Sequence, residues 1–519
     1  MTPQRYPIGQ QDFATIRKEG KVYVDKTDLI YNLIDRYNYV FLARPRRFGK
    51  SFLLSTIQAY MEGKKELFDG LAIANLEKDW ISYPVLHLEL SRIDSGSPAS
   101  LTSLLNNQFK EWEKIYAIEE TDFDLSQRFE NIIKGAFKST SQRVVILVDE
   151  YDNPLINTLH NRSIHDRNRE LLKSIYSNFK ALDGFIKFAM LSGVSRFSKT
   201  SIFSGVNNLT DISFYDRYAS ICGFTEEEIK KYLWPGVEIL GREKKKSPEQ
   251  ALADLKASYD GYHFTENCVD IYNPYSLLRA LDESKIKSYW FETATPGFLV
   301  EKLKESSIPF ASLFNDIADS ATLSEPDTYS SSPVALLYQT GYLTIKGYEK
   351  RYEEYRLGIP NMEVKKGLFE ALLTFLLEQD KREARTRVSK MRESLEKGEP
   401  HVFLDHLRSF LAKVPNSIMP KMPEAYFEHA LYILLQLIDV ESEVEVSTSY
   451  GRIDLLITTE KYRYVIEIKL DKDSGTALSQ IERKEYDLPY KFDERKVFNI
   501  GVNFSSKTRN ITDWTISTP

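Results

Sequence analysis

A lysine and a hydroxyl follow a glycine at the end of a short basic loop. Residues 44–51 read RPRRFGKS, so Gly49, Lys50 and Ser51 are consecutive. The apolar run 39–43 precedes this loop and a helical pattern follows it. A strand, a tight loop and a helix are the context of a phosphate-binding loop, in which backbone N–H groups and the helix N-terminus converge on one anion. The order of residues therefore predicts a nucleotide-phosphate site.

The polar side chains of the loop have separate predicted roles. Lys50 is expected to reach the β- and γ-phosphates of ATP, and the Ser51 hydroxyl is expected to ligate Mg²⁺. Arg46 and Arg47 add charge that a triphosphate can use. Arg44 stands where the pattern G-x-x-x-x-G-K-[ST] has its first glycine, so this loop must be built differently. An ordinary basic turn between a strand and a helix is the alternative interpretation.

Two acids end a second apolar run. Residues 144–148 are VVILV, and Asp149 and Glu150 follow. Such a run predicts a strand buried on both faces of a parallel sheet, and open α/β sheets bind ligands at the carboxyl ends of strands. Asp149 matches the Walker B acid that holds Mg²⁺ through water, and Glu150 is the natural general base for the attacking water. The alternative is a buried strand ending in a polar turn at Asn153-Pro154.

A further strand is predicted over residues 185–191. Ser192 ends it and is a candidate sensor of the γ-phosphate. Arg196 has two interpretations, which the sequence leaves open. Its guanidinium either stabilises phosphate charge in the transition state or lies in solvent on a loop.

The C-terminal region holds a second set of candidate catalytic residues. Glu467 and Lys469 alternate along the apolar strand 464–470, and Asp454 lies in the preceding strand, 451–457. The period of two places Glu467 and Lys469 on one face, which Asp454 can join from the adjoining strand. Converging carboxylates are costly to bury without a cation. Because the ligands are oxygens, Mg²⁺ or Mn²⁺ is expected rather than zinc.

A helix predicted over residues 424–439 supplies a further carboxylate. Glu424 is expected to complete the metal shell, and Glu428 on the same helical face competes for that role. Asp454 and Glu467 would hold the metal, and Lys469 would orient or help activate the attacking water. The alternative is a surface strand with a Glu467–Lys469 ion pair.

Composition sets outer limits on the class of protein. The 519 residues are 42% hydrophobic and 28% charged, with a formal net charge of −6, so there is no global basic signature of nucleic-acid binding. Two cysteines, Cys222 and Cys268, are too few for a disulfide framework or a structural zinc site. No apolar run has the length of a membrane span and the N-terminus is polar, so we expect a cytoplasmic protein without membrane association.

The motifs together resemble a known family. They include the loop 44–51 and the acids 149–152, and the other matching segments are residues 23–27 (YVDKT), 223–225 (GFT), 259–264 (YDGYHF) and 272–274 (YNP). The chain resembles, nearly end to end, the bacterial AAA-ATPase-like proteins with a C-terminal PD-(D/E)XK nuclease-superfamily domain. Arg44 is that family's own loop variant. The resemblance implies ATP binding and a P-loop fold, and the D…E-x-K arrangement of Asp454, Glu467 and Lys469 fits its nuclease part. Gln480 and Tyr486 resemble the Q and Y elements of some nuclease branches.

The expected fold class is α/β, with three domains. Residues 1–224 form a P-loop NTPase core, residues 225–380 a helical lid with a winged-helix-like region, and residues 381–519 a small α/β PD-(D/E)XK nuclease-like domain. Helices are expected to start at Thr225 and at Asn273-Pro274, and His263 is read as a core histidine.

Three functional hypotheses follow from these features. The first is an ATPase whose nucleotide state gates a metal-dependent nuclease acting on DNA or RNA. The second is a signalling or defence switch with the nuclease-like domain as its effector. The third is a binding protein without turnover. ATP and nucleic acid are the expected partners, and a homo-oligomer is compatible with the sequence.

Overall fold

Apolar runs in the N-terminal part of the chain form a five-stranded parallel sheet. Its order is β2 (Val85–Glu89), β3 (Val144–Asp149), β4 (Ile186–Gly193), β1 (Tyr39–Ala43) and β5 (Thr210–Asp211). Every residue of β1 and β3 is buried, as predicted for strands covered on both faces. Strand β4 lies between β1 and β3, and all three run parallel. Their C-terminal ends therefore bring together the loop after β1, Ser192 on β4 and the acids at the end of β3.

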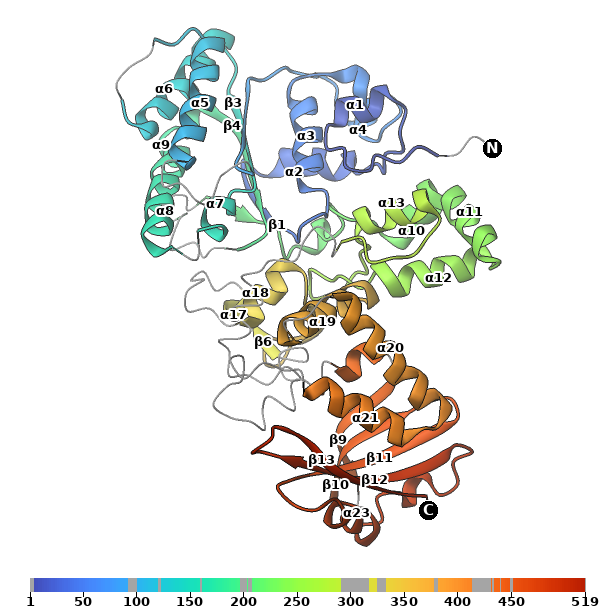
Figure 1. The fold of residues 1–519 in the computed structure, drawn as a ribbon. Helices are drawn as coiled ribbons and strands as arrows, with labels where there is room; N and C mark the ends of the chain where they lie inside the picture. Colours follow the sequence, from blue (N-terminus) through green and yellow to red (C-terminus); the bar gives the residue numbers. More distant parts are fainter. Residues whose placement is uncertain are drawn as a thin grey trace. The chain divides into compact units, whose positions relative to one another are not determined.

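Helices cover both faces of this sheet (Figure 1). One face carries α1 (Phe13–Lys18), α2 (Thr27–Arg36), α3 (Lys50–Met61) and α4 (Ile73–Leu76). The other face carries α5 (Ser100–Ile115), α6 (Leu125–Thr140), α8 (Arg162–Tyr176) and α9 (Asn178–Ala181).

The computed structural model describes most of the chain, and it divides the chain into two compact units. The described residues are 4–91, 100–119, 123–158, 161–196, 203, 208–290, 317–323, 333–377, 381–412, 431, 434–438, 440–448 and 451–518. The first unit is Met1–Ala294 with Phe314–Val364, and the second is Thr295–Leu313 with Lys365–Pro519. The first unit thus includes both the predicted core and most of the predicted middle region.

A helical region with its own hydrophobic core follows the parallel sheet within the first unit. It contains α10 (Glu226–Glu228), a π-helical turn (Ile229–Leu233), α11 (Trp234–Lys244), α12 (Pro248–Tyr259) and α13 (Pro274–Glu283). The helix start predicted at Thr225 is confirmed, because Thr225 and Glu228 form a reciprocal capping box. The start predicted at Asn273 is confirmed too, since its side chain accepts a hydrogen bond from the Ser276 N–H (3.0 Å).

The rest of the first unit is a helix with a small antiparallel sheet. Helix α18 (Pro333–Thr340) leads into β7 (Thr344–Glu349), which pairs with β8 (Glu354–Gly358), and β6 (Ile317–Asp319) lies on the other side of β8. Strands β7 and β8 form a hairpin, and the winged-helix-like character expected for this region stays a prediction. His263 bridges the Ile345 carbonyl (2.6 Å) and Asp270 (2.7 Å), which is a structural role.

A second five-stranded sheet forms the centre of the second unit. Its order is β13 (Asn510–Ser517), β12 (Lys496–Ser505), β11 (Tyr462–Leu470), β10 (Gly451–Thr458) and β9 (Glu441–Thr448). Only β11 and β12 run parallel, and α23 (Ser474–Arg483), which connects them, packs against both. Helices α20 (Lys381–Lys397) and α21 (Pro400–Leu411) precede the sheet. Of the helix predicted over 424–439, residue 431 and residues 434–438 are described, and they are helical.

No helix in the described ranges combines the length and apolarity that crossing a membrane requires.

Candidate functional site

The loop 44–51 ends in a left-handed glycine that opens α3. Gly49 has φ +92°, a conformation that favours glycine, and no side chain among the described residues caps the N-terminus of α3. The first N–H groups of this helix therefore remain for a ligand, as an anion site requires. Lys50 is buried, and its Nζ donates to the carbonyls of Arg44 (3.0 Å) and Pro45 (3.1 Å). Burial lowers the pKa of Lys50, and the negative charge of Asp149 opposes that shift.

Arg44 stands at the position of the missing glycine, and its side chain holds the loop in place. Its side chain is 2% exposed, and Nη1 donates to the Ser213 carbonyl at 2.9 Å while Nη2 donates to the Tyr218 carbonyl at 3.2 Å. The guanidinium also lies 4.1 Å from the centroid of the Phe264 ring. The side chain therefore fixes the base of the loop to the segment after β5 and to the helical region. Sequence reasoning noted the departure at Arg44 and missed this role.

The two acids at the end of β3, Asp149 and Glu150, have different surroundings. Asp149 is buried, and its Oδ1 accepts hydrogen bonds from the Ser192 hydroxyl (2.6 Å) and from the Glu150 N–H (3.1 Å). Glu150 has φ +52° and a half-buried side chain. Burial raises the pKa of Glu150, and the positive charge of Lys50 opposes this rise. A carboxylate with a raised pKa next to a phosphate site is suited to take a proton from water.

Asp152 is a buried acid whose role sequence reasoning did not assign. Its Oδ2 accepts hydrogen bonds from the N–H of Val194 (2.9 Å) and from the N–H (2.6 Å) and hydroxyl (2.5 Å) of Ser195. These bonds join the turn after β3 to the end of β4. Asp152 therefore positions the strand end that carries Ser192. In the sequence, only its position three residues after Asp149 could have indicated a role for Asp152 at this site.

Arg196 is engaged in an ion pair. Its guanidinium donates to Asp211 through Nε (2.8 Å) and Nη2 (2.6 Å), and it lies 4.2 Å from the centroid of the Phe214 ring. It does not belong to the lining of the cavity described next. This geometry adds a third interpretation to the two that the sequence left open: Arg196 forms a structural ion pair with Asp211.

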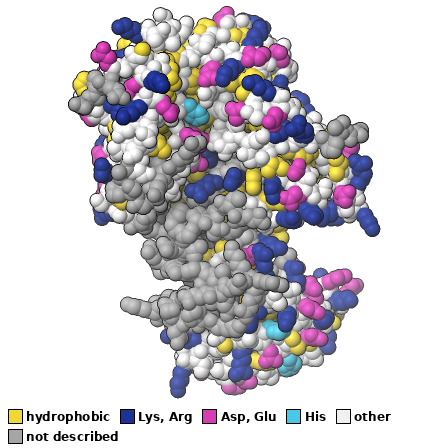
Figure 2. Space-filling model, turned by 45° about the horizontal axis from the view of Figure 1, so that its top comes forward, with side chains coloured by type: hydrophobic (Ala, Val, Ile, Leu, Met, Phe, Trp, Pro, Cys, Tyr) yellow, Lys and Arg dark blue, Asp and Glu magenta, His cyan; other side chains and the backbone are white. Residues whose placement is uncertain are grey.

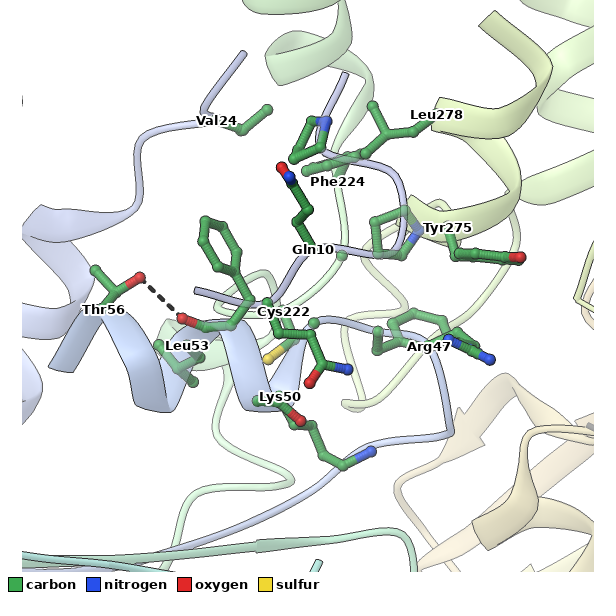
Figure 3. A pocket seen from close by; sticks show the side chains of 18 of the residues that line it. Gln10, Val24, Arg47, Lys50, Leu53, Thr56, Cys222, Phe224, Tyr275 and Leu278 are labelled. Carbon is green, nitrogen blue, oxygen red and sulfur yellow. Dashed lines mark hydrogen bonds between the residues drawn. The ribbon is translucent and has the colours of Figure 1, made fainter. Parts of the chain in front are cut away.

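A cavity of about 470 Å³ opens over the loop (Figure 3). One end is polar and is lined by the loop and by Glu150. The other end is mainly apolar and comes from the N-terminal segment, from the segment around Phe224 and from α13. The polar lining includes Arg46, Arg47, Gly49, Lys50, Ser51 and Glu150, and the apolar lining includes Ile8, Val24, Phe224, Tyr275 and Leu278. This volume is within the usual range for small-molecule and cofactor sites.

The second unit brings three of its predicted site residues together. Asp454 on β10 accepts a hydrogen bond from the Ile468 N–H (2.8 Å). Glu467 on β11 is 1% exposed and accepts from Lys469 Nζ (2.7 Å) and from the Gln480 amide. Burial raises the pKa of Glu467, and the charge of Asp454 adds to the rise while Lys469 opposes it.

Close approach of α23 to β12 positions Gln480. Gly501 pairs with Glu467 across the strands, and a Cβ at Gly501 would lie 2.3 Å from the Ser474 carbonyl and 2.5 Å from the Leu478 nitrogen. Only glycine leaves room for α23 at this distance, and the helix then presents Gln480 to Glu467. Tyr486 is buried in the hydrophobic core beside this helix.

The carboxylates fit a divalent cation. The second oxygen of Glu467 is buried and has no hydrogen-bond partner in the described part of the chain. Such an oxygen is costly to leave unpaired, and a cation held with Asp454 would satisfy it. The described residues contain no group of three or more His, Cys, Asp or Glu side chains suited to hold a metal. Glu424 and Glu428 lie outside the described residues, so their assignments stay predictions.

Replacing Glu467 with glutamine is expected to stabilise the metal-free protein more at high pH than at low pH. Because burial raises its pKa, folded Glu467 keeps a proton that the unfolded chain, with a glutamate pKa of about 4.3, has already released. The wild type therefore loses folding free energy as the pH rises through that raised pKa, and the glutamine variant does not.

Urea unfolding with a chelator, at about pH 5 and about pH 8, measures this difference. Glu482→Gln on the exposed side of α23 is the matched control. A stability difference between Glu467→Gln and wild type that stays constant or shrinks with rising pH would contradict the assignment.

Two parts of the chain match known protein families. Residues 7–203 match the family described as predicted AAA-ATPase, and residues 422–514 match the PD-(D/E)XK nuclease superfamily. The chain is also 34% identical over 526 residues to a protein of Azotobacter chroococcum mcd 1 described as an uncharacterized protein in the vnfD 5′ region. That similarity covers 99% of this chain and 99% of the relative. The two parts of the chain thus have counterparts within one protein.

Proposed function

Because the chain belongs to the family of predicted AAA-ATPases that carry a C-terminal PD-(D/E)XK nuclease-superfamily domain, we propose that it binds and hydrolyses ATP and that nucleotide state controls a metal-dependent nuclease. The resemblance inferred from the motifs is confirmed by these matches. What we propose beyond family membership is the ATP site, the nuclease site and the control of the second by the first.

The two-ended cavity is the observation that carries ATP binding. Its polar end presents Lys50, Ser51 and the uncapped N-terminus of α3, which suit a polyphosphate. Its apolar end suits a nucleobase, with Phe224 and Leu278 on the wall. Ser51 and Asp149 would hold Mg²⁺, which would neutralise phosphate charge when bound. Arg46 and Arg47 lie where they can contact phosphate oxygens, and Ser192 orients the Asp149 carboxylate.

Glu150 is the proposed general base for hydrolysis. Glu150→Gln is expected to keep ATP bound and to slow hydrolysis by about 100-fold or more, because the amide cannot accept a proton from water. Binding measured by calorimetry and phosphate release measured in parallel test this expectation. Glu66→Gln, an exposed substitution in the same unit, should match the wild type. Unchanged phosphate release in Glu150→Gln would exclude Glu150 as the base.

The nuclease site is proposed at Asp454, Glu467 and Lys469. The two carboxylates would hold Mg²⁺ or Mn²⁺, which polarises a phosphodiester and lowers the pKa of bound water when present. Gln480 holds one oxygen of Glu467, leaving the other oxygen for the cation. Lys469 forms an ion pair with Glu467, and its ammonium would orient a water molecule beside the phosphate.

Nucleic acid is the proposed partner, bound through local contacts. On the face drawn in Figure 2, Lys and Arg side chains stand among Asp and Glu side chains. The net charge of −6 agrees with that mixture. We therefore expect phosphate contacts near the nuclease residues to dominate binding, rather than one broad basic surface.

A switch is the second candidate, and the loop favours it. Arg44 fastens the loop to neighbouring segments where a standard loop has a flexible glycine. A loop that is held in place favours slow exchange and slow hydrolysis of the bound nucleotide. Slow turnover suits a signalling or defence switch with the nuclease as effector. Tightly retained ATP with negligible turnover would support this candidate, and steady hydrolysis stimulated by nucleic acid would support the first.

A further inference from the structure

Two arginines of the phosphate-binding loop rest on aromatic rings of the helical region. The Arg44 guanidinium lies 4.1 Å from the centroid of Phe264, and that of Arg47 lies 4.9 Å from the centroid of Tyr275. Arginine over an aromatic face is attractive, and more so where water is excluded. The two contacts differ in exposure, because Arg44 is 2% exposed whereas Arg47 is an exposed residue.

Two further contacts join the same loop to the same region. Phe48 packs edge-on against Tyr262, with ring centroids 4.8 Å apart. The Trp290 indole N–H donates to the Arg46 carbonyl at 3.1 Å. Loop positions 44, 46, 47 and 48 each contact an aromatic residue between 262 and 290. With the glycine of the standard pattern at position 44, the contact of Arg44 with Phe264 would be missing.

Arg47 and Tyr275 are the pair that borders the cavity. Both line it, and Figure 3 shows Arg47 next to Tyr275 on the loop side of α13. Arg47 has φ +69°, a left-handed conformation that is costly for a residue with a side chain. Pro274 and Leu278, the neighbours of Tyr275 on α13, line the same wall. A nucleotide that fills the cavity therefore touches the loop on one side and α13 on the other.

We propose that Arg47 and Tyr275 form a clasp that must open before a nucleotide leaves the cavity. Besides any phosphate contact that Arg47 makes, its contact with Tyr275 sets the nucleotide dissociation rate by holding the loop against α13. This inference rests on the proposed nucleotide site. It predicts that the rate of release depends on a contact made between two protein side chains, and not only on contacts with the phosphates.

The test is a chase of a fluorescent ATP analogue from the full-length protein, followed by stopped flow. Arg47→Met and Tyr275→Leu are each expected to raise the dissociation rate about twofold to fivefold, the range of an exposed cation–π contact. The double variant should dissociate no faster than the faster single variant, because both substitutions remove the same contact. Thermal midpoints should stay at wild-type values, which a general loss of structure would not allow.

Arg351→Met is the matched control. It removes another arginine–aromatic contact, between Arg351 and Tyr352 at 5.5 Å, which lies outside the cavity lining. Its dissociation rate should equal that of the wild type. Tyr275→Leu separates the clasp from a direct phosphate contact, since Tyr275 has no charge to offer a phosphate.

Two results would overturn the clasp while nucleotide binding persists. They are an unchanged dissociation rate in Tyr275→Leu and fully additive effects in the double variant. Absence of nucleotide binding in the wild type would instead overturn the proposed nucleotide site, and the clasp with it.

Discussion

Replacing Lys50 with alanine abolishes ATP binding if the loop site is correct. Lys50 is buried at the loop, and its neutral partners are the carbonyls of Arg44 and Pro45, so its positive charge remains available to a polyphosphate. Charge-assisted hydrogen bonds to phosphate are about twice as strong as neutral ones. We expect the dissociation constant to rise by about 100-fold or more, beyond the range of calorimetry at ordinary protein concentrations.

Two comparisons make this result specific. Lys64→Ala removes an exposed lysine just beyond the end of α3 and should bind ATP as the wild type does. Circular dichroism and thermal unfolding should show that Lys50→Ala is folded. Wild-type affinity in folded Lys50→Ala would remove the loop from the nucleotide site.

Alanine at Asp454 or at Glu467 is expected to remove both cation binding and phosphodiester cleavage. The two carboxylates come from adjoining strands, and the charge of Asp454 helps to raise the pKa of Glu467. Removing either one takes away one of the two carboxylates proposed to hold the cation. Lys469→Ala is expected to retain Mn²⁺ and to lose about 100-fold or more in rate, since the lysine orients water without holding the metal.

Calorimetry with Mn²⁺ and a cleavage assay on the same preparations check this pattern. Glu482→Ala, an exposed residue of α23, is the control and should leave both measurements unchanged. Retained cleavage in Asp454→Ala and Glu467→Ala would exclude this site. Loss of metal binding in Lys469→Ala would show that the lysine shapes the metal site itself.

Much of the fold could be predicted from local patterns in the sequence. The apolar runs before Arg44 and Asp149 form β1 and β3, because strands buried on both faces need uninterrupted apolar residues. Helix starts at Thr225 and Asn273 were readable since capping depends on residues three or four positions apart. The alternation of Glu467 and Lys469 likewise predicted their shared face, and they do form an ion pair.

Contacts between distant segments were not readable from the sequence. Arg44 donates to carbonyls about 170 residues along the chain, and no local pattern specifies that direction. Arg196 pairs with Asp211 at the end of β5, so its charge is engaged in a way that a solvated or catalytic interpretation did not include. The role of Asp152 depends on how β3 and β4 end side by side. Each of these residues required the tertiary structure.

The most direct measurement of the central claim is the rate of nucleic-acid cleavage with and without ATP. Wild type, Lys50→Ala and Asp454→Ala would be compared on single- and double-stranded DNA and RNA in the presence of Mn²⁺. We predict that the wild type cleaves at least one of these substrates at a rate that changes with ATP. Lys50→Ala should cleave at a rate independent of ATP, and Asp454→Ala should not cleave. Cleavage by the wild type that depends on Asp454 but is the same with and without ATP would contradict the coupling of the two sites.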